Sequence, residues 1–258
     1  MIMLRGIARY DGVVFAGWQI QPDQPTVQGA IESALSRIAR RPIRILGASR
    51  TDAGVHAFGQ VFSFRWPAAL PWDRLALSVS QLQRPHLRIE RIEPAPAGFH
   101  ATHDALGKRY AYTICMARAL DPFLQGRAWS IPWRLDTKGV ARLARKLEGT
   151  HDFAGFQSAG SPRPTTVRTL YSVRVLDGPS CGPLDAQDTW RIEYVGDGFL
   201  YRMVRNLTGT LVDIARGYRS PEWLDECLAS PGPFKGLCAP AEGLALVHVY
   251  YPGDAFPG

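Results

Sequence analysis

The feature that most constrains the fold of this 258-residue chain is an order of expected strands and helices that occurs twice. Each half reads strand, helix, strand, strand, helix, strand, although the residues themselves do not repeat. The elements of the first half are expected at residues 2–10, 27–38, 43–48, 62–66, 71–82 and 87–92. Those of the second half are expected at residues 109–114, 137–147, 166–176, 190–195, 200–215 and 244–250.

This order is that of a split β-α-β unit, so the predicted fold class is α+β, with two ferredoxin-like units side by side and mainly antiparallel sheets. The expected domains are residues 1–103 and 104–258. A crevice between the two halves is the expected place for a substrate. The second half adds a helix near 221–228 and a Gly/Pro-rich loop at 177–188, whose role stays open.

Two helices carry the clearest local signals. Thr26 can cap the first of them, and the apolar residues of that helix fall on one stripe: Val27, Ala30, Ile31, Ala34, Leu35 and Ile38. The helix at 200–215 has its own stripe, formed by Leu200, Met203, Val204, Leu207, Leu211 and Ile214. Arg202, Arg205 and Arg216 lie off that stripe, as on any surface helix, and a polar face of this kind also suits phosphate contact.

Composition excludes several classes of protein. Hydrophobic residues make up 46% and charged residues 21%, which is ordinary for a globular chain and unlike a disordered chain or a coiled coil. No apolar run approaches the ~18 residues that cross a bilayer, and the amino end does not resemble a secretory signal. The cytoplasm is therefore the expected compartment, without a membrane partner. The four Cys form no C-x-x-C pair, so neither a zinc ribbon nor a redox dithiol is indicated.

The net charge of +7 comes mostly from arginine, because only four of the 30 basic residues are Lys. Guanidinium groups bind phosphate oxygens through two parallel hydrogen bonds, so this excess favours nucleic acid or another polyanion as a partner. A GC-rich genome that favours Arg codons explains the excess equally well.

The segment from Gly47 to Gln60 is the strongest candidate for chemistry, because it forms a loop between two expected strands. Arg50 precedes Asp52 by two residues, which in an extended segment places both side chains on one side, where the cation would keep the carboxylate ionised. Gly54 allows a sharp turn after them. The alternative is a turn in which Asp52 bonds nearby backbone groups.

The run Arg50-Thr-Asp-Ala-Gly-Val-His56 resembles the signature of the tRNA pseudouridine synthase A family, which modifies the anticodon arm. Further blocks resemble that family in its order along nearly the whole chain: Tyr10-Asp-Gly12, Phe15-Ala-Gly-Trp18, Thr26-Val-Gln-Gly29, Phe99-His-Ala101, Lys108-Arg-Tyr110 and Phe199-Leu-Tyr-Arg-Met-Val-Arg-Asn206. Ser49 departs from the family, which often has Gly there, and we expect altered loop packing without a change of chemistry. The resemblance also implies the pseudouridine synthase fold.

The resemblance implies isomerisation of uridines at positions 38–40 of the tRNA anticodon stem-loop to pseudouridine. Asp52 matches the family's catalytic carboxylate and is expected to act as nucleophile, by attack at the sugar C1′ or at the base. Tyr110 is expected to stack on the uracil, and Arg205 to pair with Asp52. The residues expected to bind the substrate are Arg50, His56, Lys108, Tyr110 and Arg202.

The resemblance further implies a homodimer that binds tRNA, and the reaction requires no redox cofactor because no electrons enter or leave. No G-x-G-x-x-G or Walker-type loop is present, so no nucleotide cofactor is expected.

Three alternatives remain open from the residues alone. Tyr110 shares one side of a strand with Tyr112 and Ile114 and could simply be core. The protein could be a non-catalytic RNA-binding protein, although the set of Asp52, Tyr110 and Arg205 counts against that. A metal-dependent hydrolase would use the ligands His100, His103 and Asp104, but two His three residues apart next to an Asp are common by chance, so no metal is expected.

Overall fold

The structure is a computed structural model that describes residues 1–160, 164–181 and 188–257, and these form two compact units. The first unit holds residues 1–106 and 246–255, and the second holds the described part of 107–245 and 256–258. The chain therefore returns to the first unit near its carboxyl end. Residues 182–187 of the loop expected at 177–188 lie outside the described residues.

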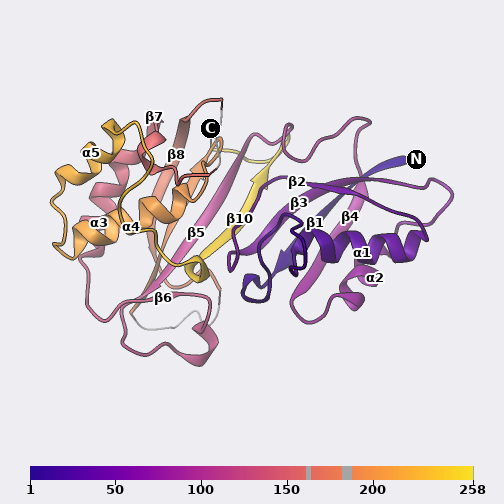
Figure 1. Cartoon of the computed structure of the whole chain (residues 1–258), viewed down its shortest axis with the longest axis horizontal. Helices are drawn as coiled ribbons and strands as arrows, with labels where there is room; N and C mark the ends of the chain where they lie inside the picture. Colours follow the sequence, from indigo (N-terminus) through magenta and orange to yellow (C-terminus); the bar gives the residue numbers. More distant parts are fainter. Residues whose placement is uncertain (161–163, 182–187, 258) are drawn as a thin grey trace. The chain divides into compact units, whose positions relative to one another are not determined.

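The first unit is a mainly antiparallel sheet with helices packed against it. Its elements are β1 (Ile2–Tyr10), α1 (Val27–Ala39), β2 (Ile45–Gly47), β3 (His56–Trp66), α2 (Leu75–Leu82), β4 (Leu87–Pro94) and β10 (Leu244–Tyr250), with a 3-10 helix at Gly12–Val14. The strand order is β4-β1-β3-β10, and β2 pairs with β3. Strand β1 runs antiparallel to both β3 and β4, and α1 and α2 cover the same face of the sheet (Figure 1).

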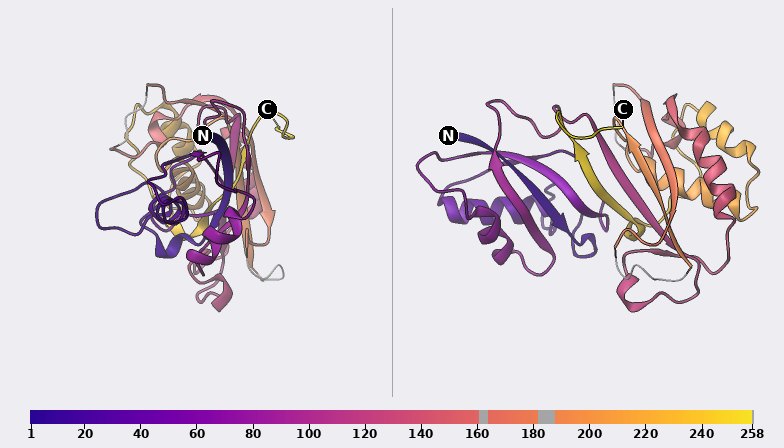
Figure 2. Two further views of the ribbon diagram at one scale, coloured as in Figure 1. Left: turned by 90° about the vertical axis from the view of Figure 1, so that its right-hand side faces the viewer. Right: turned by 180° about the vertical axis from the view of Figure 1, so that it is seen from behind.

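The second unit repeats this layering with more elements. They are β5 (Gly107–Cys115), β6 (Trp129–Ser130), α3 (Thr137–Ala144), β7 (Gly149–Asp152), β8 (Val167–Asp177), β9 (Thr189–Gly196), α4 (Met203–Ala215) and α5 (Glu222–Ala229), with 3-10 helices at Pro122–Leu124, Arg145–Leu147, Ala154–Phe156 and Ala241–Gly243. The order β5-β9-β8-β7 is antiparallel throughout, and only β6 joins β5 in parallel. Helices α3, α4 and α5 gather on one face of this sheet (Figure 2).

The predicted α+β class with mainly antiparallel sheets is confirmed. All twelve elements of the repeated order are present, and so is the added helix expected near 221–228, which is α5. Strands β6 and β7 were not predicted, because two to four residues carry too little periodicity to detect. Several predicted bounds differ from the structure. The strand expected from residue 62 begins at His56, so residues 56–60 of the segment expected to be a loop belong to β3, and the strand expected at 43–48 covers only Ile45–Gly47. The helix expected from residue 71 begins at Leu75, and the one expected from residue 200 begins at Met203, because Arg202 adopts the left-handed conformation with φ 58°. In the described residues, no helix is long and apolar enough to cross a membrane.

Helix α4 is buried almost all round, which corrects the prediction of a surface helix. Besides the predicted apolar stripe, its polar residues Asn206, Thr208, Thr210 and Asp213 are buried. Thr208 lies 2.9 Å from the hydroxyl of Tyr194 on β9. On another side, a Cβ added at Gly209 would lie 1.8 Å from the carbonyl oxygen of Leu237. Helix α4 is thus enclosed between the sheet and the segment that precedes β10.

Candidate active site

The Asp52 loop, defined here as residues 49–55 between β2 and β3, is anchored at its start by a buried amide side chain. Gln60 on β3 is completely buried, with 0% of its surface exposed. Its Nε2 donates to the carbonyl oxygen of Ser49 at 2.6 Å, and its Oε1 accepts from the Ser49 amide at 3.2 Å. These paired bonds satisfy both backbone groups of Ser49 and fix where the loop leaves the sheet.

The residue before Asp52 is held through both its backbone and its side chain. The amide of Trp18 donates to the carbonyl oxygen of Thr51 at 3.0 Å, and the hydroxyls of Thr51 and Tyr10 lie 2.8 Å apart. Gly17, with φ 97°, makes this approach possible, because a Cβ there would lie 2.7 Å from the Thr51 carbonyl oxygen. The backbone next to Asp52 is therefore fixed by contacts from β1 and from the loop before α1.

Asp52 itself is half-buried, and Arg50 is exposed. The chain turns directly after Asp52, because the amide of Val55 donates to the Asp52 carbonyl oxygen at 3.1 Å. Gly54 adopts φ 80° within this turn, as the sequence predicted, and its amide donates to the carbonyl oxygen of Phe15. A half-buried carboxylate on an anchored loop can meet a molecule that arrives from solvent, while its backbone stays in place.

His56 begins β3 and lies buried against the turn that follows β1. Its Nδ1 is 3.1 Å from the amide nitrogen of Gly12 and 3.3 Å from Oδ1 of Asp11. A neutral imidazole accepts the Gly12 N–H at Nδ1, whereas a protonated one would donate to Asp11 instead. A Cβ at Gly12 would lie 2.2 Å from the Val55 carbonyl oxygen, so this turn packs directly on the Asp52 loop. His56 thus positions the turn, and its contact with substrate stays a prediction.

Tyr110 and Lys108 lie at the start of β5 in the second unit. The Tyr110 side chain is buried and meets the ring of Phe199 edge-on, with ring centroids 5.1 Å apart and planes at 79°. Lys108 is half-buried. Tyr112 and Ile114 are buried on the same strand, as expected for a core strand. Burial alone therefore does not separate a catalytic Tyr110 from a core tyrosine.

Arg205 is half-buried on the first turns of α4, and a backbone segment fixes its orientation. Its Nε donates to the carbonyl oxygen of Ala239 at 2.8 Å, and the Ala239 amide donates back to the Arg205 carbonyl oxygen at 3.2 Å. The next residue, Pro240, accepts the hydroxyl of Tyr112 at 2.7 Å. Burial raises the pKa of Tyr112 well above its ordinary value, Glu242 adds to the rise and Arg205 opposes it, so this hydroxyl remains a donor.

Arg202 lies outside α4, so the helical-wheel argument does not apply to it. It is exposed in a left-handed conformation, with its guanidinium 4.9 Å from the ring centroid of Tyr201. Arg216 at the other end of α4 lies 2.6 Å from Oδ1 of Asp213, a contact that partly neutralises it.

The His100 to Asp104 segment forms a hydrogen-bonded turn. Nδ1 of His100 accepts the amides of Thr102 and His103, and Oδ2 of Asp104 accepts the His100 amide at 2.9 Å. In the part of the chain that the structure describes, no group of three His, Cys, Asp or Glu residues is arranged to hold a metal ion.

Sequence reasoning did not assign the residues that hold the site. Tyr10 had a signal, since it lies in one of the blocks that resemble the family. Gln60 ends the segment expected to carry chemistry, but nothing in the sequence indicated that its side chain would bond Ser49. Ala239 had no signal, because an Ala before Pro240 is unremarkable until the fold brings it to Arg205.

Comparisons with known proteins find relatives along the whole chain. A curated relative from Moorella thermoacetica, described as tRNA pseudouridine synthase A, is 42% identical over 246 residues, covering 94% of this chain and 96% of its own. Another from Syntrophotalea carbinolica, with the same description, is 37% identical over 261 residues and covers both chains completely. Among solved structures, the "Crystal Structure of a Cbf5-Nop10-Gar1 Complex" is similar with a TM-score of 0.36 and 8% identity, covering 81% of this chain and 53% of that one.

A family model described as tRNA pseudouridine synthase matches residues 7–104 and 143–252. The matched residues make up more than half of the chain and include Asp52 and Arg205, while Tyr110 lies between the two matched segments. This chain therefore belongs to the tRNA pseudouridine synthase family.

Proposed function

We propose that this protein isomerises uridine to pseudouridine at positions 38–40 of the tRNA anticodon stem-loop, with Asp52 as the nucleophile. The observation that carries the proposal is the anchored Asp52 loop, in which hydrogen bonds to Ser49 and Thr51 hold the backbone while the carboxylate remains partly exposed. Family membership and the relatives' shared description supply the reaction and the substrate.

The reaction breaks the bond from uracil N1 to the ribose C1′ and forms a bond from C5 to C1′. The C5 proton leaves and N1 gains one, so atoms and electrons balance without a co-reactant. An ionised aspartate can add to the sugar or to the base and later leave, which divides the exchange into two steps. Since a stacked base is out of reach, the target uridine must first leave its stack, at a cost of a few kcal/mol that RNA contacts offset.

The other predicted residues take supporting roles in this proposal. Tyr110 stacks on the uracil and assists removal of the C5 proton, and Arg205 pairs with Asp52 and keeps its carboxylate ionised. Arg50, His56, Lys108 and Arg202 bind the RNA, mainly through its backbone. A homodimer completes the proposal, as the resemblance to the family implies, with the cytoplasm as its compartment.

The test is tritium release from C5-labelled tRNA transcript by Asp52→Asn, beside Asp73→Asn as a control at an exposed aspartate. We expect Asp52→Asn to lose turnover while binding tRNA within about threefold of wild type, and Asp73→Asn to behave as wild type. Appreciable turnover by Asp52→Asn would refute the nucleophile assignment.

Mapping pseudouridine in the same transcript, with EDTA present, tests the reaction and its position together. Pseudouridine at positions 38–40 supports the proposal, and modification elsewhere refutes the site assignment. Binding without any modification would instead indicate a non-catalytic RNA-binding protein, and activity that EDTA abolishes would indicate a metal-dependent enzyme.

A further inference from the structure

A groove of about 590 Å³ in the first unit runs along α1 from Gly29 to the segment after the helix, with Ile20 also in its lining. Four arginines line this groove, and all four are exposed: Arg37, Arg40, Arg41 and Arg44. Its other polar side chains are the hydroxyls of Ser33 and Ser36 and a single carboxylate, that of Glu32. We call this hollow, with the four arginines in its lining, the arginine groove.

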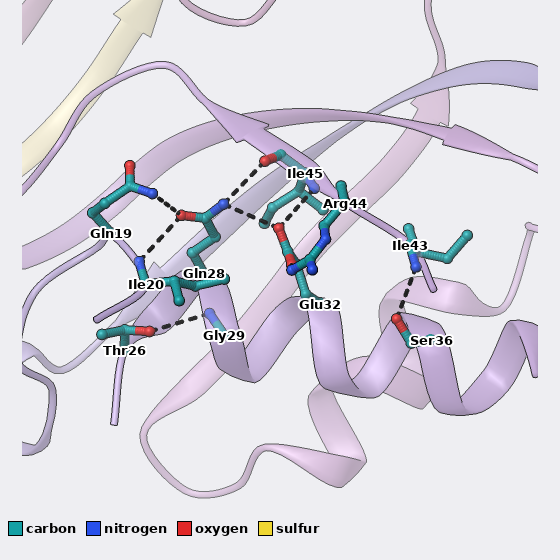
Figure 3. Close-up of polar contacts among 10 residues, drawn as sticks. All are labelled: Gln19, Ile20, Thr26, Gln28, Gly29, Glu32, Ser36, Ile43, Arg44 and Ile45. Atoms are coloured by element: carbon teal, nitrogen blue, oxygen red, sulfur yellow. Dashed lines mark hydrogen bonds and ion pairs between the residues drawn. The ribbon is translucent and has the colours of Figure 1, made fainter. Parts of the chain in front are cut away.

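The one carboxylate of the arginine groove is already occupied. Oε1 of Glu32 accepts the amide of Ile45 and Nε2 of Gln28, each at 3.0 Å, and Oε2 accepts Nη1 of Arg44 at 2.7 Å (Figure 3). The Glu32 side chain is 7% exposed and that of Arg44 80% exposed. Glu32 thus ties α1 to β2 and anchors Arg44 at the edge of the groove, with its guanidinium in solvent.

The other three arginines carry uncompensated charge. In the described residues, 1–160, 164–181 and 188–257, no carboxylate forms an ion pair with any of these three: Arg37, Arg40 and Arg41. Several like charges around one hollow repel one another and attract an anion. Because a guanidinium presents paired N–H donors that match phosphate oxygens, the arginine groove is suited to phosphate groups.

Arg40 occupies a position where helix geometry alone would favour glycine. It ends α1 in the left-handed conformation, with φ 51° and ψ 33°, and its amide donates to the Ser36 carbonyl oxygen. Glycine is the usual residue at such a helix end, because a Cβ is disfavoured there. The helix dipole favours a positive charge at this end of α1, but it does not require a residue with a Cβ in the left-handed conformation, and binding of an anion would explain why an arginine stands there instead of glycine.

The four arginines lie in the last turn of α1 or after it, whereas the Asp52 loop is held at the amino end of the helix, toward which Ile20 and Gly29 extend the lining of the groove. At the amino end of the helix, the Val27 amide bonds the carbonyl oxygen of Gly17, whose neighbour Trp18 bonds Thr51. Helix α1 has 13 residues, and at a rise of ~1.5 Å per residue its two ends are ~20 Å apart. A ligand that reaches both must be an extended polyanion, which a single nucleotide is not.

We propose that the arginine groove binds the phosphate backbone of the substrate RNA, at a stretch of the molecule away from the target uridine. The inference rests on the proposed function, because it takes the RNA that meets Asp52 to continue along α1. Contacts of this kind recognise the shape and charge of RNA without reading its bases.

The test compares two triple variants that remove the same charge. One is Arg37→Gln/Arg40→Gln/Arg41→Gln, and the control is Arg74→Gln/Arg84→Gln/Arg118→Gln, at three exposed arginines outside the groove. The dissociation constant for unmodified tRNA transcript is measured between 0.05 and 0.5 M KCl, and pseudouridine formation is measured at saturating tRNA. Arg44 is left unchanged because it holds Glu32.

Each phosphate contact is worth about fivefold in affinity at ~0.15 M salt, as the salt dependence of counterion release implies, so three contacts are worth about 100-fold. We expect the groove variant to bind about 100-fold more weakly, with a salt slope lower by about 2 to 3, and the control to change less than about threefold. Turnover at saturating tRNA should stay within about twofold of wild type. Equal affinity and salt slope in the two triple variants would overturn the proposal.

Arg40→Gly separates a binding role from a structural one. We expect this variant to melt at a higher temperature, because it relieves the left-handed residue, and to bind tRNA about fivefold more weakly. A loss of thermal stability with unchanged binding would refute the role given to Arg40.

The measurements also separate this proposal from the proposed function. If wild type forms no pseudouridine but the groove variant still loses affinity, the proposed activity is refuted and RNA binding by the groove is supported. If wild type has normal turnover and the groove variant binds tRNA as wild type does, RNA binding by the groove is refuted and the proposed activity is supported.

Discussion

Gln60→Leu tests whether the paired bonds to Ser49 hold the Asp52 loop in its working position. The substitution keeps a side chain of similar size in a completely buried site. It removes both the donor to the Ser49 carbonyl oxygen and the acceptor of the Ser49 amide. Ser49 loses both of these bonds at once, and Leu offers no replacement for them.

The magnitude follows from the cost of unsatisfied backbone groups. Each buried group left without a partner costs about 1–3 kcal/mol. Ser49 is half-buried, so some solvent can reach it, and we take about 2–4 kcal/mol for the pair. For a chain of this size that lowers the melting temperature by roughly 5–15 °C. A loop displaced by about 1 Å would lower kcat by up to ~100-fold.

The assay combines thermal unfolding followed by circular dichroism with tritium release over a range of tRNA concentrations. We expect kcat to fall by about 10- to 100-fold with KM within about threefold, because a completely buried side chain acts on the position of Asp52 and not on the binding of tRNA. Gln81→Leu, at an exposed glutamine of α2, is the matched control and should leave both quantities unchanged. A Gln60→Leu variant with wild-type melting temperature and kcat would refute the argument that these bonds position Asp52.

Two further predictions concern stability. Thr26→Ala removes the hydroxyl that accepts the Gly29 amide at the start of α1, so we expect the free energy of unfolding by urea to fall by about 1 kcal/mol. Thr26→Ser should restore it. Equal urea midpoints for wild type and both variants would contradict the cap. Burial raises the pKa of the Cys227 thiol to about 11, so between about pH 9 and pH 11 the unfolded thiol ionises while the folded one does not. The free energy of unfolding should therefore fall as pH rises through that range, and a Cys227→Ala variant that falls just as steeply would disprove the contribution of this thiol.

Elements with local signals were predictable from the sequence. Strand β1 has the predicted bounds, and α1 follows Thr26, whose side chain accepts the amide of Gly29 as expected for a cap. Capping and the apolar stripe depend only on residues within a few positions of one another, so the sequence contains all the information they need. The same holds for the turn after Asp52, which Gly54 indicated.

Helix α4 shows where local reasoning stops. Its apolar stripe was correct, but nothing near it in sequence indicates that Thr208 and Thr210 are also buried. They are buried because Tyr194 contacts one side of the helix and the segment around Leu237 approaches the other. A helical wheel shows which face is apolar, and it does not show how many faces the rest of the chain covers.

The candidate site divides in the same way. The motif around Asp52, the order of the elements and the family resemblance were all present in the sequence, because each is a property of residues close together along the chain. The anchoring of the loop by Gln60 and Tyr10, and of Arg205 by Ala239, joins residues 11, 41 and 34 positions apart. Only the folded chain closes such loops, since their entropic cost is met by the burial of the whole core and not by any local preference.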